Sequence, residues 1–485
     1  MIKPSLEDAK RLSQGCTLVP IALEIFSDQK TPIEIIRNIR NLGSSCFILE
    51  SVNGGEGWGR YTFLGYNPII NVYGTGDTVV IKNGGESREE KRNPIEVVRE
   101  LIERYKSPSI PGLPPFTGGF VGYFSYDFVQ NCIPGLELRS QNEEKFRDFH
   151  LMLIDKVIAF DHLKQKMYVI VNIPAEDIEN GYSKGFQDLN DIASMILTGS
   201  RPQDEHCSCG EFSAMLSEEN FKEMVLKIKS HIMEGDIFQA VVSNRFKAPF
   251  KGSLINAYRM LRTINPSPYM VYMRTDDIEI ACSSPETLAS LQNGEVSSFP
   301  LAGTCPRGKT EDEDKALIAA LLKDEKELAE HDMLVDLARN DIGKVCKFDT
   351  VKVQDYRQIK RYSHVSHISS HVTGKIRNDV DALDVLMASL PAGTLSGAPK
   401  KRACEIIDDA EGKRRGVYGG AIGYIDFTGN MDMCIGIRMA VLKGGNVFVQ
   451  AGAGIVADSV PEKEYAETRN KSHAVIKALK DAGGL

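Results

Sequence analysis

The sequence lacks any apolar run long enough to cross a membrane, since no segment approaches the ~18 consecutive apolar residues of a spanning helix. Its first ten residues, MIKPSLEDAK, contain no apolar core of the kind found in secretory signal peptides. The formal net charge of −8 argues against nucleic acid as the main partner, although a protein with this net charge can still carry local basic patches. Together these absences predict a cytoplasmic protein.

A disulfide framework is also missing, because the ten cysteines are scattered along the chain. In a chain of this length without an export signal, such cysteines are expected to be reduced thiols. Only residues 206–209 (HCSC) form a cluster, and no second pair at zinc-finger spacing accompanies it. We interpret this cluster as part of a linker.

Nucleotide-binding motifs are not supported. Residues 450–457 (QAGAGIVA) formally fit the dinucleotide fingerprint, but the segment DSVP intervenes before the next helical pattern, whereas a Rossmann turn opens directly into a helix. Residues 393–397 (GTLSG) lack the Gly-Lys-Ser/Thr ending of a P-loop. We therefore expect Gly452 and Gly454 to let a ligand approach the backbone.

What is present is a globular composition, with 42% hydrophobic and 26% charged residues among 485. A chain of this length forms two domains or one large elaborated one. The polar run at residues 198–210 has no periodicity and predicts a boundary, which separates regions 1–200 and 215–485.

Strand-like and helix-like runs are mixed without clean alternation. Strands are expected at residues 45–49, 78–82, 167–171, 240–246, 269–273, 278–282 and 447–451, and helices at 217–235, 313–339, 382–390 and 462–480. This order favours a mixed α/β fold (α+β type) with large, mostly antiparallel sheets over a doubly wound parallel sheet.

Residues 391–400 (PAGTLSGAPK) form a loop rich in glycine and proline that runs directly into a helical pattern. Backbone N–H groups and the positive end of the helix dipole converge at such a point, so the loop is a candidate site for a carboxylate or phosphate. A plain surface turn before an amphipathic helix fits the same residues equally well.

Two predicted helices each carry an acidic pair at i, i+3, namely Glu327 with Glu330 and Glu464 with Glu467. Each pair shares one helix face, and facing pairs would suit a hard dication such as Mg2+. Glutamate-rich helices are more often solvated faces, so spacing alone leaves both interpretations open.

Three other kinds of polar side chain are candidates. His364, His367 and His371 would face together on a helix, whereas His364 and His367 would point to opposite faces of a strand, and at least two of the three are expected to be structural or surface residues. Glu286 ends a predicted strand and, if buried near an apolar wall, would hold a proton and act as a general acid. Arg438 lies in an apolar run predicted as a strand, where a substrate carboxylate or an internal acid would pair with it.

Six ordered motifs resemble the chorismate-utilising enzymes, and in particular the large subunits of anthranilate synthases. They are residues 300–308 (PLAGTCPRG), 330–341 (EHDMLVDLARND), 393–400 (GTLSGAPK), 418–424 (YGGAIGY), 450–454 (QAGAG) and 467–471 (ETRNK). The resemblance implies a two-layer sandwich of the large sheets, flanked by helices, in which regions 1–200 and 215–485 interleave.

The resemblance also implies a reaction in which ammonia attacks C2 of chorismate, the C4 hydroxyl leaves, and loss of pyruvate gives anthranilate. It implies Mg2+ between Glu330 and Glu467, a general acid at Glu286, and a histidine near the ring at His367. Supporting residues around the ion are Glu327 and Glu464, and the implied chorismate pocket comprises Gly303, Thr304, Tyr418, Arg438, Gly452, Ala453, Gly454 and Lys471.

Two positions separate the branches of this family. Isochorismate and salicylate synthases carry a lysine that activates water where this chain has Gln239, and aminodeoxychorismate synthases typically carry a lysine where it has Ala302. Both differences favour free ammonia as the attacker. The alternatives are an aminodeoxychorismate synthase component, against which Ala302 argues, and a non-catalytic tryptophan-binding protein, against which the intact acidic residues argue.

Region 1–200 resembles the part that binds tryptophan as a feedback inhibitor, through residues 48–51 (ILES) and 57–65 (GWGRYTFLG), with residues 265–270 (NPSPYM) as the other wall. The resemblance implies that Ser51, Pro268, Tyr269 and Met270 contact tryptophan. No glutamine-hydrolysing module is visible in the sequence, so the expected partner is a glutamine amidotransferase subunit that supplies ammonia.

Overall fold

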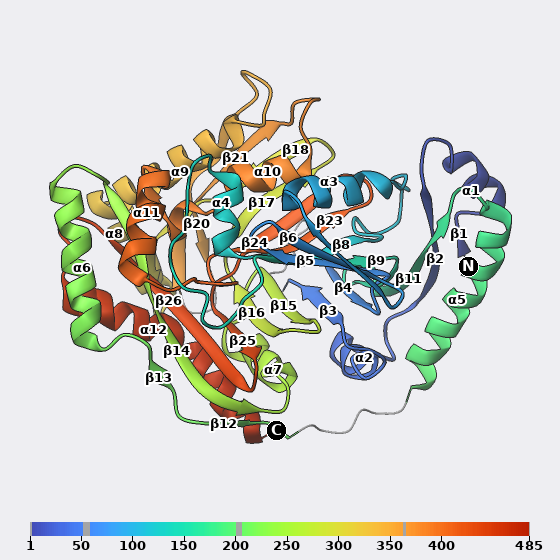
Figure 1. Cartoon of the computed structure of the whole chain (residues 1–485), viewed down its shortest axis with the longest axis horizontal. Helices are drawn as coiled ribbons and strands as arrows, with labels where there is room; N and C mark the ends of the chain where they lie inside the picture. The colour runs from blue at the N-terminus through green and yellow to red at the C-terminus, as the bar shows by residue number, and fades with distance from the viewer. Residues whose placement is uncertain (1, 52–58, 200–205, 362–364, 485) are drawn as a thin grey trace.

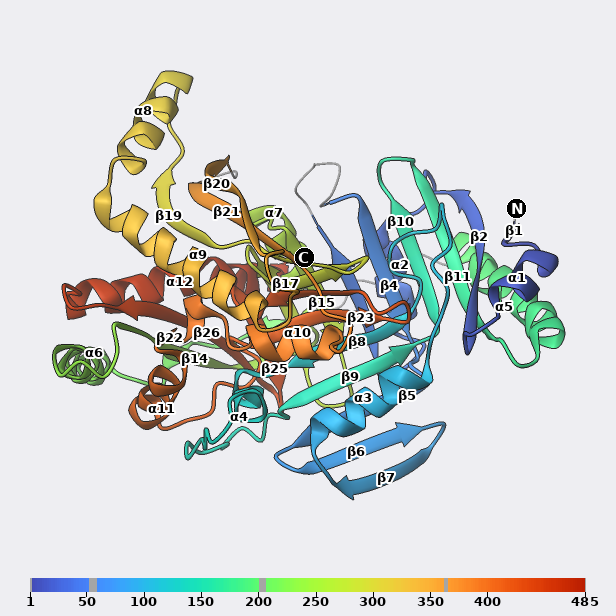
Figure 2. The same ribbon diagram turned by 90° about the horizontal axis from the view of Figure 1, so that it is seen from above.

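The structure is a computed structural model that describes residues 2–51, 59–199, 206–361 and 365–484. Two large antiparallel sheets pack face to face, and helices cover the outer face of each (Figure 1). Figure 2 shows α1 (Leu6–Leu12) and α5 (Ile178–Thr198) on the outer side of one end of the first sheet. The predicted mixed α/β class, with mostly antiparallel sheets in a two-layer sandwich, is confirmed.

The first sheet joins strands from both halves of the sequence. Its order is β1 (Ile2–Lys3), β2 (Leu18–Phe26), β11 (Lys166–Pro174), β10 (Lys156–Asp161), β4 (Tyr61–Tyr66), β3 (Cys46–Glu50), β15 (Tyr269–Arg274), β16 (Glu279–Ser284), β25 (Met439–Lys443), β26 (Asn446–Ile455), β14 (Gln239–Lys251) and β12 (Ser208–Cys209). Two short strands, β13 (Ser213–Ala214) and β22 (Gly397–Ala398), also pair with β14.

The second sheet crosses the halves in the same way. Its order is β19 (Leu301–Pro306), β21 (Val365–Lys375), β18 (Glu295–Ser298), β17 (Thr287–Gln292), β24 (Met431–Ile435), β23 (Ala421–Asp426), β8 (Gly119–Phe124), β9 (Phe149–Ile154), β5 (Ile70–Thr75), β6 (Thr78–Asn83) and β7 (Glu86–Lys91), with β20 (Lys352–Arg361) paired to β21. Pairing of β3 with β15 and of β8 with β23 joins the two parts of the chain, while the boundary between regions 1–200 and 215–485 stays a prediction.

The remaining helices lie around the sheets. They are α2 (Pro32–Ile39), α3 (Pro94–Arg104), α4 (Val129–Cys132), α6 (Glu218–Met233), α7 (Ile255–Ile264), α8 (Glu311–Leu321), α9 (Glu325–Gly343), α10 (Ala382–Ser389), α11 (Lys400–Glu411) and α12 (Pro461–Asp481), with 3-10 turns η1 (Tyr126–Phe128), η2 (Gly393–Leu395) and η3 (Ala482–Gly484). Across the described ranges, none of these helices combines the length and apolarity needed to span a bilayer.

Three apolar layers hold the sandwich together. Side chains such as Tyr123 on β8 and Val271 on β15 form the layer between the sheets. A second layer packs α2, α5, α7 and α12 against the first sheet, and a third packs α3, α9 and α10 against the second. Since each fully buried large apolar side chain contributes about 1.5–3 kcal/mol, these layers fix the strands whose ends carry the polar site.

Two sequence-based predictions are wrong. Residues 313–339 do not form one helix, because Asp324 accepts hydrogen bonds from the backbone N–H groups of Lys326 and Glu327 and thereby caps a new helix, α9. Residues 206–209 are not simply linker, since β12 pairs with β14 and Cys207 is buried in the apolar layer. Residues 200–205 of the predicted boundary lie outside the described part of the chain.

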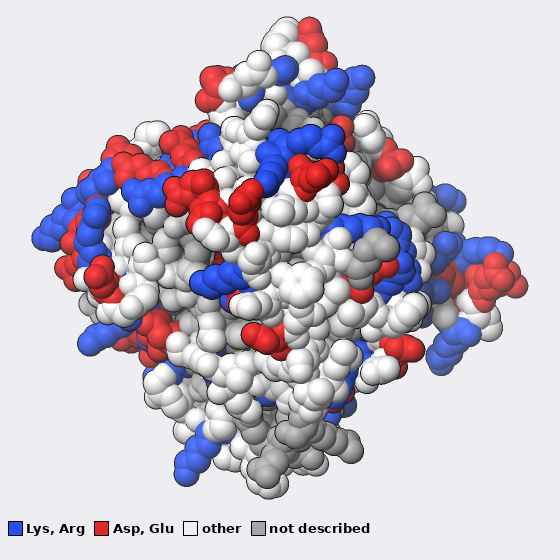
Figure 3. All heavy atoms as spheres, turned by 90° about the vertical axis from the view of Figure 1, so that its right-hand side faces the viewer, with Lys and Arg blue, Asp and Glu red and all other residues white. Residues whose placement is uncertain are grey.

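Lysine and arginine side chains are interspersed with aspartate and glutamate on the face shown in Figure 3. No broad surface of one sign forms on that face.

Candidate functional site

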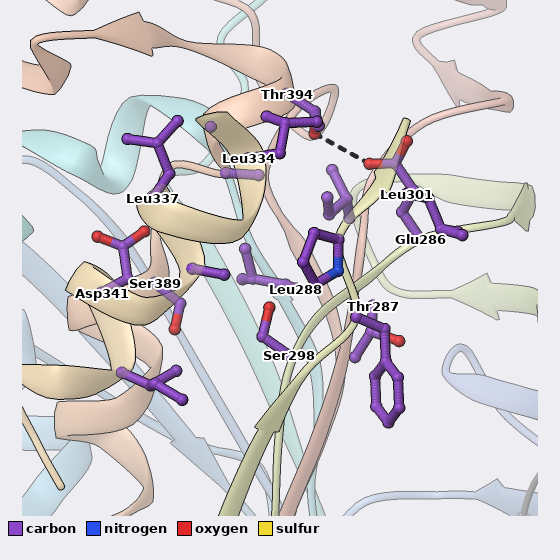
Figure 4. Close-up of a pocket in the computed structure, with 17 residues that line it drawn as sticks. Glu286, Thr287, Leu288, Ser298, Leu301, Leu334, Leu337, Asp341, Ser389 and Thr394 are labelled. Atoms are coloured by element: carbon purple, nitrogen blue, oxygen red, sulfur yellow. Dashed lines mark hydrogen bonds between the residues drawn. The ribbon is translucent and has the colours of Figure 1, made fainter. Parts of the chain in front are cut away.

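Glu286 lies between the end of β16 and the start of β17, where the chain passes from one sheet to the other. Its main-chain carbonyl accepts a hydrogen bond from the Ile435 N–H at 3.0 Å. Its Oε2 accepts one from the Thr394 hydroxyl at 2.9 Å (Figure 4). The loop at residues 391–400 therefore contacts a carboxylate, that of an internal glutamate.

An apolar wall surrounds this carboxyl group. Glu286 and Thr394 line a cavity of about 60 Å³ with Leu288, Leu334 and Leu337 (Figure 4). Burial raises the pKa of Glu286, although the Thr394 hydroxyl and the charges of Lys471 and Arg438 oppose the rise. A carboxyl group with a raised pKa in a cavity has the character of a general acid.

Two cations approach the site from α12 and from the bend before β25. Lys471 Nζ donates to the Gly452 carbonyl at 3.1 Å and pairs with Glu467 at 2.6 Å. Arg438 donates to the Lys471 carbonyl at 3.0 Å. Both charges act on the Glu286 carboxylate. This arrangement can hold an anionic ligand beside the candidate acid.

The strand assignment of Arg438 is wrong. The residue lies between β24 and β25 with φ 52°, in the left-handed region that non-glycine residues seldom adopt. Such strained positions persist only where the surroundings enforce them, and they cluster at functional sites. Burial lowers the pKa of the Arg438 guanidinium.

Tyr418 and the glycines of β26 form another part of the wall. A side chain at Gly452 would come within 2.9 Å of the Tyr418 hydroxyl, and one at Gly454 would come within 2.9 Å of Gln239 Nε2. Ala453, between them, points into the apolar core with Phe221, so its side chain faces away from the site. The alternation follows from the two-residue period of a strand.

His367 on β21 is joined to β19. Its Nδ1 lies 2.9 Å from Thr304 Oγ1 and 3.3 Å from the Gly303 carbonyl oxygen, and burial lowers the His367 pKa. Gly303 has φ +73° at a register shift in β19, and a side chain there would press on Ile368 and approach Glu327. The strand alternative for the histidine-rich segment is the correct one, and His364 lies outside the described residues.

The acidic pairs of α9 and α12 are close enough to interact. Burial, together with the charges of Glu327 and Glu467, raises the pKa of Glu330. Burial and the charge of Glu467 likewise raise the pKa of Glu464. Among the described residues, no three of these four side chains bring their ligand atoms within 4.8 Å of one another. His231, Glu234 and Asp236 do. The charges of Glu327 and Glu467 therefore disfavour ionisation of Glu330, and the charge of Glu467 disfavours ionisation of Glu464. Carboxylate oxygens are the kind of ligand that a hard dication takes, so these residues stay the candidates to hold one.

The residues expected to bind tryptophan come together elsewhere. Ser51, Pro268, Tyr269 and Met270 all line one cavity of about 280 Å³ between the sheets. Ser51 Oγ is buried and has no hydrogen-bond partner among the described residues. Glycine and tryptophan at positions 57 and 58 of the same motif lie outside those residues.

Sequence reasoning missed Asp432 in this cavity and did not place His371 there. The Tyr269 hydroxyl donates to Asp432 at 2.8 Å and accepts from the Thr287 hydroxyl at 3.1 Å, and burial raises the Asp432 pKa to about 6. His371 lines the cavity and stacks on Phe299. His367 and His371 share one face of β21 about 13 Å apart, so this strand reaches both sites. Asp432 lies on β24 and His371 on β21, far from residues 265–270 in the sequence, and no local motif marks either as part of this cavity.

Comparison with known proteins supports the same family. The chain matches the family described as chorismate binding enzyme over residues 46–477. It is 44% identical to anthranilate synthase component 1 of Acetivibrio thermocellus over 100% of both chains. It is 43% identical to that of Aquifex aeolicus over 99% of this chain and 98% of the relative.

A solved structure agrees. The crystal structure of anthranilate synthase component I from Streptococcus pneumoniae superposes with a TM-score of 0.79 at 35% identity, covering 93% of this chain and 98% of that one. Motifs, fold and full-length similarity thus point the same way, and the chain belongs to the chorismate binding enzyme family, among the relatives of anthranilate synthase component 1.

Proposed function

We propose that this chain is the chorismate-converting component of an anthranilate synthase, a carbon-oxygen lyase that forms anthranilate and pyruvate from chorismate and ammonia. The observation that carries the proposal is the meeting of Glu286, Lys471 and Arg438 at one site in a chain similar over its whole length to such components. That site offers a proton donor beside two cations, as a dianionic substrate with a poor leaving group requires.

Glu286 would supply the proton. Hydroxide is a poor leaving group. A proton therefore passes from the Glu286 carboxyl group to the C4 oxygen as the C4–O bond breaks, and the electron pair of that bond leaves with the water molecule. Ammonia forms the new C–N bond at C2 while the two ring double bonds shift toward C4, and the resulting ammonium loses a proton. Removal of the C2 proton and loss of the enolpyruvyl group as pyruvate then form the aromatic ring. His367, near the pocket wall, is the candidate to assist that elimination.

Each charged group of the site would bind a different part of the substrate. Arg438, with Tyr418 nearby, would bind the enolpyruvyl carboxylate, and Lys471 would lie near the ring carboxylate. Glu330 and Glu467 would hold Mg2+, with Glu327 and Glu464 around them. An ion held by these residues would offset their negative charge and would supply a positive centre for the ring carboxylate. The mutual repulsion of these carboxylates is the feature of the chain that fits a dication.

Two neutral side chains favour ammonia as the attacking group. Gln239 lies over Gly454, and its amide cannot take a proton from water as a lysine amine would. Ala302 is buried on β19 and cannot form a covalent adduct with the substrate. The second candidate function is that of an aminodeoxychorismate synthase component. Such a component is expected to carry a lysine at position 302, where this chain has alanine.

The proposal is tested by mixing the purified chain with chorismate, Mg2+ and an ammonium salt and recording anthranilate fluorescence. We expect product with ammonium, none with glutamine alone, and glutamine-dependent product after a glutamine amidotransferase subunit is added. Accumulation of aminodeoxychorismate without anthranilate would overturn the proposal in favour of the second candidate.

Feedback inhibition by tryptophan at the 280 Å³ cavity gives a separate prediction. Ser51→Leu is expected to raise the tryptophan concentration for half-inhibition by roughly tenfold or more, because overpacking costs about 1–3 kcal/mol. The ammonia-dependent rate without tryptophan is expected to change less than about twofold, because the cavity is separate from Glu286.

The matched control is Ser87→Leu, a serine exposed on β7 at the edge of the second sheet. Tryptophan inhibition titrations and calorimetry on both variants separate local from general effects. Unchanged inhibition in Ser51→Leu would reject the assigned effector site while leaving the proposed reaction intact.

A further inference from the structure

Thr394 lies in η2, inside the glycine- and proline-rich loop at residues 391–400, and takes no part in the proton transfer proposed for Glu286. Its hydroxyl donates to Glu286 Oε2 at 2.9 Å, and Figure 4 shows the two side chains directed at each other from different segments. Among the described residues, no hydrogen bond to Glu286 Oε1 accompanies this one. The two carboxyl oxygens are therefore unequal.

The loop around Thr394 is held on several sides. The Ser396 carbonyl accepts from the Val241 N–H at 2.7 Å, and the Leu395 carbonyl accepts from the Arg415 guanidinium at 2.7 Å. Lys400, at the end of the loop, pairs with Asp341 of α9 at 2.7 Å. These anchors come from β14, from the segment after α11 and from α9. Thr394 is thus fixed before any ligand arrives, as a positioning group must be.

Glycine at position 393 lets the loop lie directly on α9. A side chain at Gly393 would come within 2.9 Å of a Leu337 methyl group. The main chain of Glu286 is fixed too, since its carbonyl accepts from the Ile435 N–H at 3.0 Å. Both ends of the Thr394–Glu286 hydrogen bond are therefore attached to rigid parts of the fold.

We propose that Thr394 is the positioning residue for Glu286: its hydroxyl occupies Oε2 as donor and leaves the transferable proton on Oε1. The inference rests on the proposed role of Glu286 as the general acid. An acid aids departure of a hydroxyl group only if its proton is on the oxygen that faces that group. After transfer, the same hydroxyl donates to the new carboxylate, so both protonation states use the contact.

The groups that face Glu286 are Thr394, Lys471 of α12, Arg438 and, across the core of the site, the Tyr418 hydroxyl. Asp341 of α9 lines the same cavity on the side away from Glu286 (Figure 4). Burial raises the Glu286 pKa, and Thr394, Lys471 and Arg438 each lower it. Removing the Thr394 hydroxyl therefore moves this pKa upward.

The test compares Thr394→Val, which keeps the shape and loses the hydroxyl, with Thr394→Ser, which keeps the hydroxyl. We expect Thr394→Val to lower kcat about tenfold, as misplacement of a reacting group does, with the KM for chorismate within about twofold. Thr394→Ser is expected to stay within about threefold of wild type. Thr394→Ala, which also lacks the hydroxyl, takes the place of the valine variant if that variant fails to fold.

The pH profile adds a readout that a purely structural role would not move. A protonated acid is lost as pH rises through its pKa, so a raised pKa shifts the alkaline limb of kcat/KM to higher pH in Thr394→Val and not in Thr394→Ser. Total ammonium is adjusted at each pH to keep free ammonia constant. In the Glu286→Gln background, Thr394→Val is expected to cost less than about twofold, since the two residues act as one unit.

The inference is overturned if the serine variant loses as much activity as the valine variant, or if Thr394→Val costs the same factor with and without Glu286. Those results would leave the proposed function standing whenever the wild-type chain makes anthranilate from ammonia. A wild-type chain that makes none would overturn the proposed function itself, and the role of Thr394 with it.

Discussion

Glu286→Gln is expected to lower kcat for anthranilate formation about 1,000-fold, within the range that general acid catalysis contributes. Glutamine is nearly the same size and can still accept the Thr394 hydrogen bond, but it has no acidic proton for the C4 oxygen. Arg438 and Lys471 remain in place, so the dissociation constant for chorismate is expected to change less than about threefold. Rapid-quench kinetics and equilibrium chorismate binding measure the two quantities separately.

The control for this change is Glu311→Gln at the start of α8, where the carboxylate is 84% exposed and pairs with Lys315. Its kcat is expected to match wild type. A Glu286→Gln enzyme that retains a third or more of wild-type kcat would contradict the acid role, because no catalyst of the proposed kind survives loss of its proton donor.

Glu330→Gln is expected to weaken Mg2+ binding at least about 100-fold, since even residues outside the coordination shell cost 10–100-fold. Without metal, the charges of Glu327 and Glu467 and partial burial raise the Glu330 pKa, so its ionised form destabilises the fold at neutral pH. The neutral variant should therefore unfold at the same Tm as metal-free wild type or higher. Mg2+ should raise the Tm of wild type only.

Thermal unfolding with and without Mg2+ measures this effect without relying on activity. Asp336→Asn serves as the control, because this substitution removes the same charge from α9. Asp336 is 74% exposed and pairs with Arg339. A Glu330→Gln variant that keeps a wild-type Tm response to Mg2+ would place the ion elsewhere.

Periodicity and caps predicted much of this fold. The helix expected at residues 217–235 is α6, which Ser217 caps, and the glycines at 452 and 454 lie within a long strand rather than in a nucleotide-binding turn. The error at residues 313–339 came from Asp324, which resembles a solvated residue of a continuous helix but caps a new one. Local capping geometry outweighed helical periodicity there.

Sequence spacing predicted less of the candidate site than of the fold. Acidic pairs on α9 and α12 follow from i, i+3 spacing, but their approach depends on tertiary packing that no local pattern reports. Arg438 was expected on a strand, and its left-handed bend has no sequence signal of its own. Thr394 was visible only as a letter in a motif, because its partner Glu286 lies 108 positions away.

The most direct measurement of the central claim follows nitrogen into the product. The chain is incubated with chorismate, Mg2+ and 15N-labelled ammonium, and the products are separated and analysed by mass spectrometry and NMR. We expect anthranilate that carries the label on its amino group, and pyruvate in equal amount. Label found in aminodeoxychorismate with no pyruvate released, or isochorismate formed with no label, would contradict it.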